Sequence, residues 1–272
     1  MQRSQNDVES RIDWGIIFCV LLLALIGLAS IYVAAVHDRQ QTSVARQVIT
    51  QLVWYAVGTI LIIVIMQFDA EQLWKLAPIV YWLSVFLMFA ILVFYSRAYY
   101  ASTGAKSWFA IGPFTFQPSE IMKPAYILMM GRVITTHNNR YSVHTVDSDW
   151  RLIGTMFLWL LPILVSLKFQ NDFGTGLVFF AIFCGMVLVS GVTWQILAPA
   201  ATILVVVGGS ALAMVTSSVG RQILEHVGFQ AYQFDRVDTW LHPEQDTTNQ
   251  GYQLWQSIKA VGSGGITGTG FN

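Results

Sequence analysis

The sequence has few charged residues and no excess of either sign. Only 11% of its 272 residues are Asp, Glu, Lys or Arg, and 15 basic residues balance 15 acidic ones. Soluble domains carry about 25% charged residues, so a conventional water-exposed surface is excluded. Nucleic acid is excluded as the main partner, because that interaction needs a basic footprint. With a mean hydropathy of +0.56, the deficit indicates that lipid is the main solvent of this chain.

Cysteine is also scarce. Cys19 and Cys184 lie in separate apolar runs, and no Cys or His stands near either of them at the spacing of a metal site. The sequence therefore predicts neither a disulfide nor a structural metal site. It has no repeat of about 20 to 50 residues and no low-complexity tract, so we expect one membrane domain over residues 1–272.

Long apolar runs are abundant. A run of about 20 apolar residues crosses the roughly 30 Å hydrocarbon core as a helix. The weakest run carries Lys123 and Arg132 near its ends, and it crosses if those side chains snorkel or face protein. The predicted spans are residues 14–36, 52–68, 76–95, 119–134, 152–167, 174–190 and 196–216. We therefore expect an all-α, polytopic membrane protein whose residues 217–272 form a loop segment.

Three polar clusters lie at the boundaries of these runs. In the first, Pro118 suits the first position of a helix, and Glu120 in the first turn is favoured by the helix dipole. Lys123 follows Glu120 at the spacing of an ion pair on one helix face. Two interpretations stay open, an ion pair that only anchors the helix start and a pair that belongs to a functional site.

The second cluster is formed by Gln170, Asn171 and Asp172, between two apolar runs, and Asp172 is a plausible N-cap for the following helix. The third is the polar segment after Ser217, whose glycine-rich end lacks the lysine of a phosphate-binding loop.

With seven crossings, all three clusters fall on one side of the membrane. Lys and Arg are divided too evenly between the two sets of loops to say which side that is. Such convergence favours a reaction on an amphiphile with an anionic head and an apolar tail.

At these residues the chain resembles the SEDS family of bacterial membrane proteins, and most of all its elongation-type members. The resemblance covers the chain from Arg11 onward and is carried by GAKSW and FQPSEIMK (104–108, 116–123), QNDFGTGLVF (170–179) and DTTNQGYQLWQSIKAVGSGG (246–265). It implies a peptidoglycan glycosyltransferase that polymerises lipid II at the outer face of the bacterial cytoplasmic membrane. The implied partners are a class B penicillin-binding protein and other membrane proteins of the elongation complex. The N-terminus would be cytoplasmic and all three polar clusters, with the 217–272 segment, extracellular.

The resemblance also implies roles for individual residues. Asp246 matches the essential loop acid of the family, and we hypothesise that it is the general base for the acceptor hydroxyl. Lys123, Arg236 or Lys106 would hold the diphosphate of the donor. The remaining substrate-binding candidates are Glu120, which would position Lys123, Gln117, and Asp172, which would brace the groove or help to hold a divalent cation. No other cofactor is implied.

The sequence departs from the family pattern at several positions. Asn171 and Thr247 replace prolines, and Ser107 replaces a basic residue. Family members have about ten spans, so with seven spans this chain is expected to be a piece of a longer protein. Three alternatives stay open, namely a division-type member of the same family, a flippase or transporter of lipid-linked precursors, and a non-catalytic scaffold that activates a partner synthase.

Overall fold

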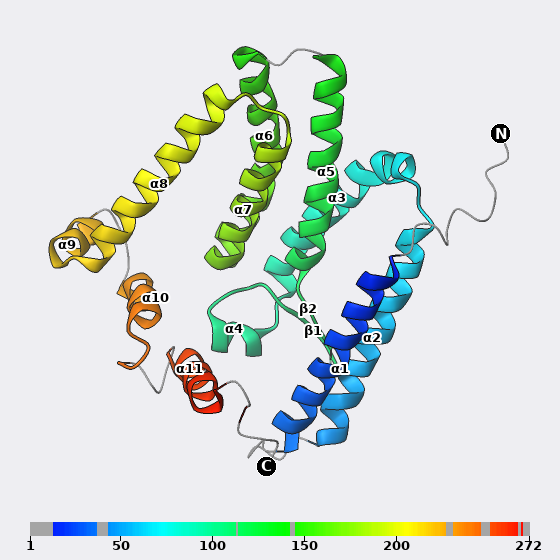
Figure 1. Ribbon diagram of the computed structural model, residues 1–272, viewed down its shortest axis with the longest axis vertical. Coiled ribbons are helices and arrows are strands. Elements are labelled where there is room, and N and C mark those ends of the chain that lie inside the picture. Colours follow the sequence, from blue (N-terminus) through cyan, green and yellow to red (C-terminus); the bar gives the residue numbers. More distant parts are fainter. Residues whose placement is uncertain are drawn as a thin grey trace. The chain divides into compact units, whose positions relative to one another are not determined.

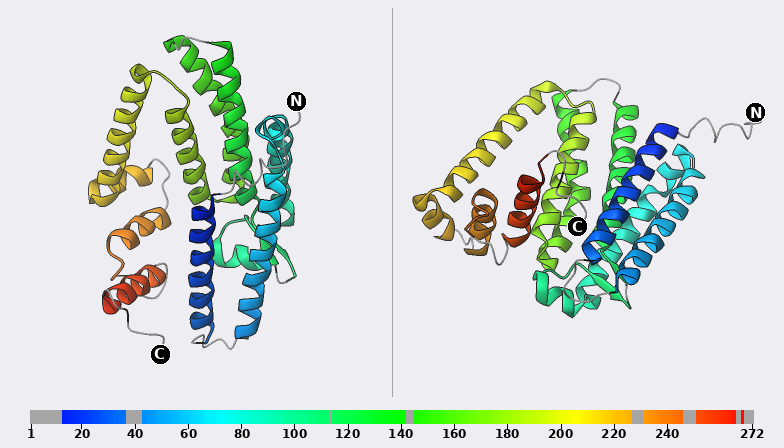
Figure 2. Two further views of the ribbon diagram at one scale, coloured as in Figure 1. Left: turned by 45° about the vertical axis from the view of Figure 1, so that its right-hand side comes forward. Right: turned by 60° about the horizontal axis from the view of Figure 1, so that its bottom comes forward.

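A computed structural model describes residues 13–36, 43–112, 114–141, 145–226, 231–245, 251–265 and 268. The chain is divided into two compact units, one of Met1–Phe68 with Gln256–Asn272 and one of Asp69–Trp255. Helices dominate both units (Figures 1 and 2). They are α1 Trp14–Val36, α2 Val44–Met66, α3 Ala70–Phe94, α4 Arg97–Thr103, α5 Pro118–Arg140, α6 Val146–Gln170, α7 Phe173–Val189, α8 Trp194–Thr216, α9 Ser218–His226, α10 Ala231–Leu241 and α11 Tyr252–Gly264.

In the first unit, α1 packs against α2. The Tyr55 hydroxyl donates to the Ala24 carbonyl at 3.2 Å, and the absence of a side chain at Gly27 leaves room for this hydroxyl beside α1. Both helices are strongly apolar, with mean hydropathies of 2.9 and 2.3, and mostly exposed. An apolar surface of this kind is stable in lipid and costly in water, so this pair is suited to the bilayer.

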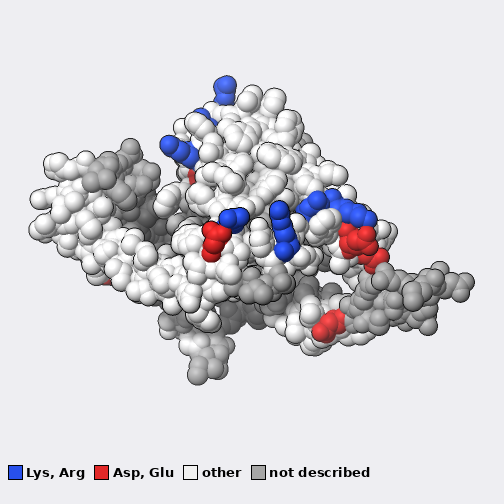
Figure 3. Space-filling view, turned by 90° about the horizontal axis from the view of Figure 1, so that it is seen from above, with Lys and Arg blue, Asp and Glu red and all other residues white. Residues whose placement is uncertain are grey.

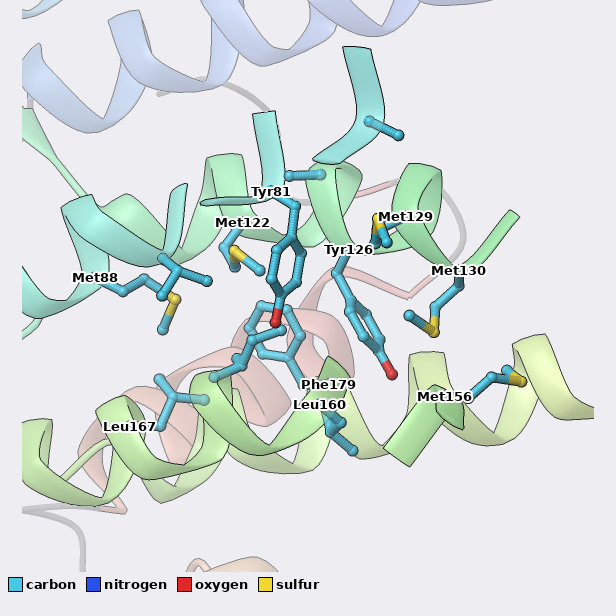
Figure 4. Packing of buried hydrophobic residues seen from close by; sticks show 14 of the residues in the cluster. Tyr81, Met88, Met122, Tyr126, Met129, Met130, Met156, Leu160, Leu167 and Phe179 are labelled. Atoms are coloured by element: carbon cyan, nitrogen blue, oxygen red, sulfur yellow. The ribbon is translucent and has the colours of Figure 1, made fainter. Parts of the chain in front are cut away.

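In the second unit, α3, α5, α6 and α7 pack around one apolar core (Figure 4). Tyr81 on α3 is fully buried and donates its hydroxyl proton to the Trp159 carbonyl on α6. Tyr126 on α5 meets Phe179 on α7 edge to face, with ring centroids 6.0 Å apart. Several methionines fill the remaining space, as their flexible side chains do in irregular cores. Helices in lipid associate through close packing and hydrogen bonds of this kind.

Each of these four helices has one terminus at the same end of the unit, which we call the Asp172 end. There Ser166 and Gln170 of α6 donate to the Met88 carbonyl of α3, at 2.8 and 3.0 Å. The same end carries α4 and a hairpin in which β1 Phe109–Ile111 pairs antiparallel with β2 Phe114–Phe116. The Lys106 N–H donates to the Gln170 carbonyl at 2.8 Å, so this connection is fixed to the end of α6.

At the opposite end, which we call the Asp149 end, the chain turns from α5 to α6 and from α7 to α8. The Asp149 carboxylate is fully buried and accepts the Thr193 N–H at 2.9 Å, just before α8 begins. Asn138 of α5 donates to the Ser190 carbonyl at 3.1 Å, just after α7. The view from this end shows a mostly uncharged surface with few Lys, Arg, Asp and Glu side chains (Figure 3).

A helix covers each predicted span, so the prediction of an all-α, polytopic helical protein is confirmed. Five of these helices, α2, α3, α5, α6 and α8, are longer than the apolar runs that predicted them. For example, α2 begins at Val44 and not at residue 52, because polar residues such as Arg46 continue a helix without continuing its apolar character. Among the described residues, five helices are long and apolar enough to cross a membrane, namely α1, α2, α3, α6 and α8. The shorter α7 and the more polar α5 leave the count of seven spans a prediction.

Two local features were not predicted from the sequence. Within the predicted loop segment 217–272, the described residues form the helices α9, α10 and α11. Apolar runs mark membrane spans and do not mark short surface helices, whose apolar residues occur only on one face. The β1–β2 hairpin was also not predicted; it turns at Gly112, whose φ of 61° suits a residue without a side chain.

Candidate functional site

The connection between α6 and α7 places Asp172 at the centre of a polar site. Asn171 ends α6 in a left-handed conformation, with a φ of 59°. The Asp172 Oδ1 atom then accepts the Thr175 N–H at 3.1 Å, so the predicted N-cap of α7 is confirmed. The other carboxylate oxygen accepts the Gln117 amide proton with an N···O distance of 3.4 Å. Asp172 therefore links the start of α7 to the start of α5.

A cavity of about 260 Å³ opens beside this carboxylate. Hydroxyl, amide and carboxylate groups form much of its wall, which is the arrangement that orients a polar ligand. The lining residues are Thr103, Ala105, Ser107, Trp108, Gln117, Asn171, Asp172, Phe173, Gly174 and Thr175. They come from the end of α4 and the α4–β1 connection, from the residue before α5, and from the α6–α7 connection with the first turn of α7, so three distant segments meet at one polar cavity.

A second, more apolar hollow of about 370 Å³ lies along α6 and α7. Its lining residues are Leu164, Leu167, Lys168, Asn171, Asp172, Phe173, Gly176 and Leu177. Asn171, Asp172 and Phe173 belong to both walls, so the apolar hollow and the polar cavity adjoin at the same three residues. The pair of hollows suits a ligand with a polar head and an apolar chain.

Two lysines lie close to this site. Lys106 stands between two residues of the cavity wall, and its Nζ atom is 5.3 and 5.7 Å from the ring centroids of Tyr95 and Tyr100. A cation held over two aromatic faces stays in a defined place. Lys168 lines the apolar hollow and was not selected in the sequence interpretation. The signal that could have found it is its position two residues before Gln170, at the polar boundary of an apolar run.

Glu120 and Lys123 form the predicted ion pair on the first turns of α5, with an N···O distance of 2.7 Å. The Lys123 side chain is 28% exposed and the Glu120 side chain 58% exposed. Pro118 occupies the first turn of α5, as predicted. Among the described residues, no contact joins this ion pair to Asp172. The structure therefore brings Gln117 to Asp172 directly and leaves Glu120 and Lys123 one turn further along α5.

The other predicted site residues belong to the third cluster. Asp246 lies outside the described residues, and Arg236 is a residue of α10 whose side chain lies outside them too. Within the described part of the chain, no three or more His, Cys, Asp or Glu side chains gather as they would around a metal ion. Both cysteines are free.

Comparison with known proteins gives the family of the chain. The model of the FtsW, RodA and SpoVE family, described as cell cycle proteins, matches residues 13–272. The chain belongs to this family. Relatives in this family include the peptidoglycan glycosyltransferase RodA of Treponema pallidum, which is 25% identical over 96% of this chain and 71% of its own length. The peptidoglycan glycosyltransferase MrdB of Escherichia coli K12 is 29% identical over 79% of this chain, which spans 52% of it.

Solved structures of the family show the same fold. The rod shape determining protein RodA of Thermus thermophilus is 26% identical, with a TM-score of 0.53 over 72% of this chain and 60% of that one. A chain of a peptidoglycan synthase complex that coordinates polymerisation and crosslinking is also 26% identical, with a TM-score of 0.65 over 94% of this chain and 67% of that one. Family membership and the apolar helices identify a multi-pass protein of the cytoplasmic membrane.

Proposed function

We propose that the whole protein is a peptidoglycan glycosyltransferase of the elongation type, which polymerises lipid II at the outer face of the cytoplasmic membrane. The observation that carries the proposal is the adjoining pair of hollows at Asp172. Lipid II joins a sugar head to a long apolar chain through a diphosphate, so its two halves match the polar cavity and the apolar hollow. The relatives named RodA and MrdB are glycosyltransferases by name, which supports the same reaction.

The reaction needs a base for the acceptor hydroxyl and a way to stabilise the leaving diphosphate. Diphosphate leaves without protonation, so a second carboxylic acid of the glycosidase kind is not required. We assign the base to Asp246. Lys106 and Lys123 would hold the diphosphate together with Arg236. Lys106 is held over its two tyrosines and Lys123 is paired with Glu120, so both cations have fixed positions before the substrate arrives.

Asp172 would orient the sugar head. One of its oxygens accepts the Thr175 N–H. The other accepts the Gln117 amide at 3.4 Å, which is long for a hydrogen bond, so a sugar hydroxyl can share or replace this contact. Phe173, the residue after Asp172, lines both the polar cavity and the apolar hollow. It would separate the sugar from the apolar chain. Glycan polymerisation would then occur with both lipid-linked sugars aligned at the membrane surface.

We propose a class B penicillin-binding protein as the partner. The similar solved chain is part of a peptidoglycan synthase complex that coordinates polymerisation and crosslinking. That complex supports a partner that performs crosslinking. Other membrane proteins of the elongation complex are the further expected contacts. Depletion in cells tests the elongation role, because an elongation-type member gives rounded cells and a division-type member gives blocked septation.

The assignment of Asp246 is tested in the full-length protein with its partner. Asp246→Asn should insert into membranes and bind the partner as the wild type does, but form no glycan polymer on a gel of lipid II products. Glu225→Gln on α9 is the matched control, because this exposed acid lies in the same external segment and should leave polymerisation unchanged. Polymer formed by Asp246→Asn at the wild-type rate would overturn the assignment.

A further inference from the structure

Trp108 gives the polar cavity an aromatic wall. Among the described residues of that wall, two carry aromatic rings, Trp108 and Phe173. Phe173 also lines the apolar hollow and is 67% exposed. Trp108 is half-buried and belongs to the wall of the polar cavity but not to that of the hollow. Its indole ring therefore adds apolar surface to a cavity whose other groups are mostly polar.

Trp108 is held in place by residues outside the cavity wall. Its ring stacks on the Tyr99 ring of α4, with centroids 5.8 Å apart and an angle of 26° between the ring planes. The Trp108 carbonyl accepts the Ser96 N–H at 2.9 Å, and two residues earlier the Lys106 N–H donates to the Gln170 carbonyl. Both the ring and the backbone are thus fixed before a ligand arrives, so binding costs little additional ordering.

The groups around Trp108 match the surface of a sugar. The hydroxyl of Ser107, the amide of Gln117 and the carboxylate of Asp172 belong to residues of the same wall. A pyranose ring carries hydroxyls around its edge and C–H groups on its faces, so it binds best where hydrogen-bonding groups stand beside an apolar plane. The face of an aromatic ring is also electrically negative and attracts the weakly positive C–H groups.

The size and position of the cavity indicate which sugar would bind there. Its volume of about 260 Å³ is smaller than the roughly 300 to 1,000 Å³ of pockets for larger ligands, which suits one sugar ring. The cavity adjoins the apolar hollow at Asn171, Asp172 and Phe173. When the apolar chain lies in the hollow, the sugar nearest to this junction is the one bonded directly to the diphosphate.

We infer that Trp108 is a substrate-binding residue whose ring stacks on the sugar bonded to the diphosphate, and that Tyr99 holds this ring in position. The inference rests on the proposed function, which supplies lipid II as the substrate. A tryptophan at a membrane boundary can also serve only as an interfacial anchor. Such an anchor would not distinguish a lipid that carries the sugar from one that lacks it, whereas a stacking residue would.

The test measures ligand binding to the full-length protein with its partner in detergent, by native mass spectrometry. The two probes are lipid II and undecaprenyl diphosphate, which has the same chain and diphosphate but no sugar. Trp108→Leu should raise the Kd of lipid II by about tenfold, because an apolar side chain without an aromatic face remains. The Kd of undecaprenyl diphosphate should change by less than about twofold, which also shows that the variant is folded.

Further variants separate stacking from the filling of space. Trp108→Phe keeps an aromatic plane and should bind lipid II within about threefold of the wild type. Tyr99→Leu should raise the Kd of lipid II by about threefold, because it removes only the support of the ring. Trp150→Leu makes the same change at an exposed tryptophan of the Asp149 end, and should leave both Kd values unchanged.

Three results would overturn the inference. They are unchanged lipid II binding in Trp108→Leu, an equal loss of both ligands in that variant, and no advantage of Trp108→Phe over Trp108→Leu. A synthetic undecaprenyl diphosphate that carries one sugar should lose affinity in Trp108→Leu as lipid II does; if only lipid II is affected, the stacked sugar is the outer one and the assignment is wrong. A wild-type protein that binds lipid II in this way and forms no polymer would contradict the proposed function instead.

Discussion

Asp149 and Asp172 lie at opposite ends of α6. Both side chains are carboxylates, but they differ in burial and in what surrounds them. Asp149, in the first turn, is fully buried and bound to the Thr193 N–H, with the Ser148 hydroxyl 3.5 Å away. Asp172, just beyond the last turn, is half-buried and lines two hollows. One carboxylate is enclosed by protein donors, whereas the other faces space that a ligand can fill.

The difference shows how surroundings decide what a carboxylate does. A buried charge is tolerated only when donors and dipoles compensate it, and the first turn of a helix together with a neighbouring N–H provides both for Asp149. The Asp149 carboxylate therefore fixes α6 to the start of α8. One oxygen of Asp172 caps α7, and the other forms only the long hydrogen bond with the Gln117 amide. The Asp172 end is where we place the chemistry, and the Asp149 end is structural.

The largest expected effect is on activity at the Asp172 end. Asp172→Asn should lower lipid II polymerisation by more than about 100-fold, because the amide cannot supply the negative charge that orients the sugar hydroxyl. Asparagine is as good an N-cap as aspartate, so the melting temperature should stay near that of the wild type. Polymerisation rates and thermal unfolding of the full-length protein in detergent measure the two effects. Near-normal polymerisation would remove Asp172 from the site.

The next effect is on stability at the Asp149 end. Asp149→Ala should lower the free energy of unfolding by about 2 kcal/mol, because it leaves the partly buried Thr193 N–H without its acceptor. Activity per folded molecule should stay close to normal, since the Asp172 end is unchanged. Thermal unfolding and the yield of folded protein provide the measurement. Asp147→Ala removes an exposed neighbouring acid and serves as the control; an equal loss there would show that burial of Asp149 is irrelevant.

A smaller effect is expected one turn into α5. Lys123→Met should lower kcat by about tenfold if this cation helps to stabilise the leaving diphosphate. Glu120→Gln should have a weaker effect, because it removes only the group that positions the lysine. Steady-state polymerisation assays compare the two. A larger loss in Glu120→Gln than in Lys123→Met would reverse these roles.

The smallest effect tests an exposed ion pair on the same unit. Lys75→Gln breaks the ion pair with Glu71. The Lys75 side chain is 65% exposed and the Glu71 side chain 78% exposed. Such pairs contribute less than about 1 kcal/mol, so neither the melting temperature nor polymerisation should change measurably. A clear loss of activity would extend the functional surface to the Asp149 end and break the contrast between the two ends of α6.

The sequence predicted contacts between near neighbours well. The Asp172 cap and the Glu120–Lys123 pair depend on spacings of three residues, which helix geometry fixes in advance. Contacts over longer separations were missed. Gln117 meets Asp172 across 55 residues, Asp149 meets Thr193 across 44, and Arg221 meets Asp238 across 17. These pairs depend on how the helices pack, which the spacing of residues in one sequence does not encode.

The central claim is that a lipid-linked sugar binds at the Asp172 end, with its apolar chain along α6 and α7. The most direct measurement places the photocrosslinker p-benzoylphenylalanine at Leu177, in the wall of the apolar hollow, in the full-length protein. Val146, an exposed residue in the first turn of α6, is the matched position at the Asp149 end. Irradiation with lipid II should give a crosslinked product from position 177 and almost none from position 146. Equal crosslinking at both positions, or none at 177, would contradict the account.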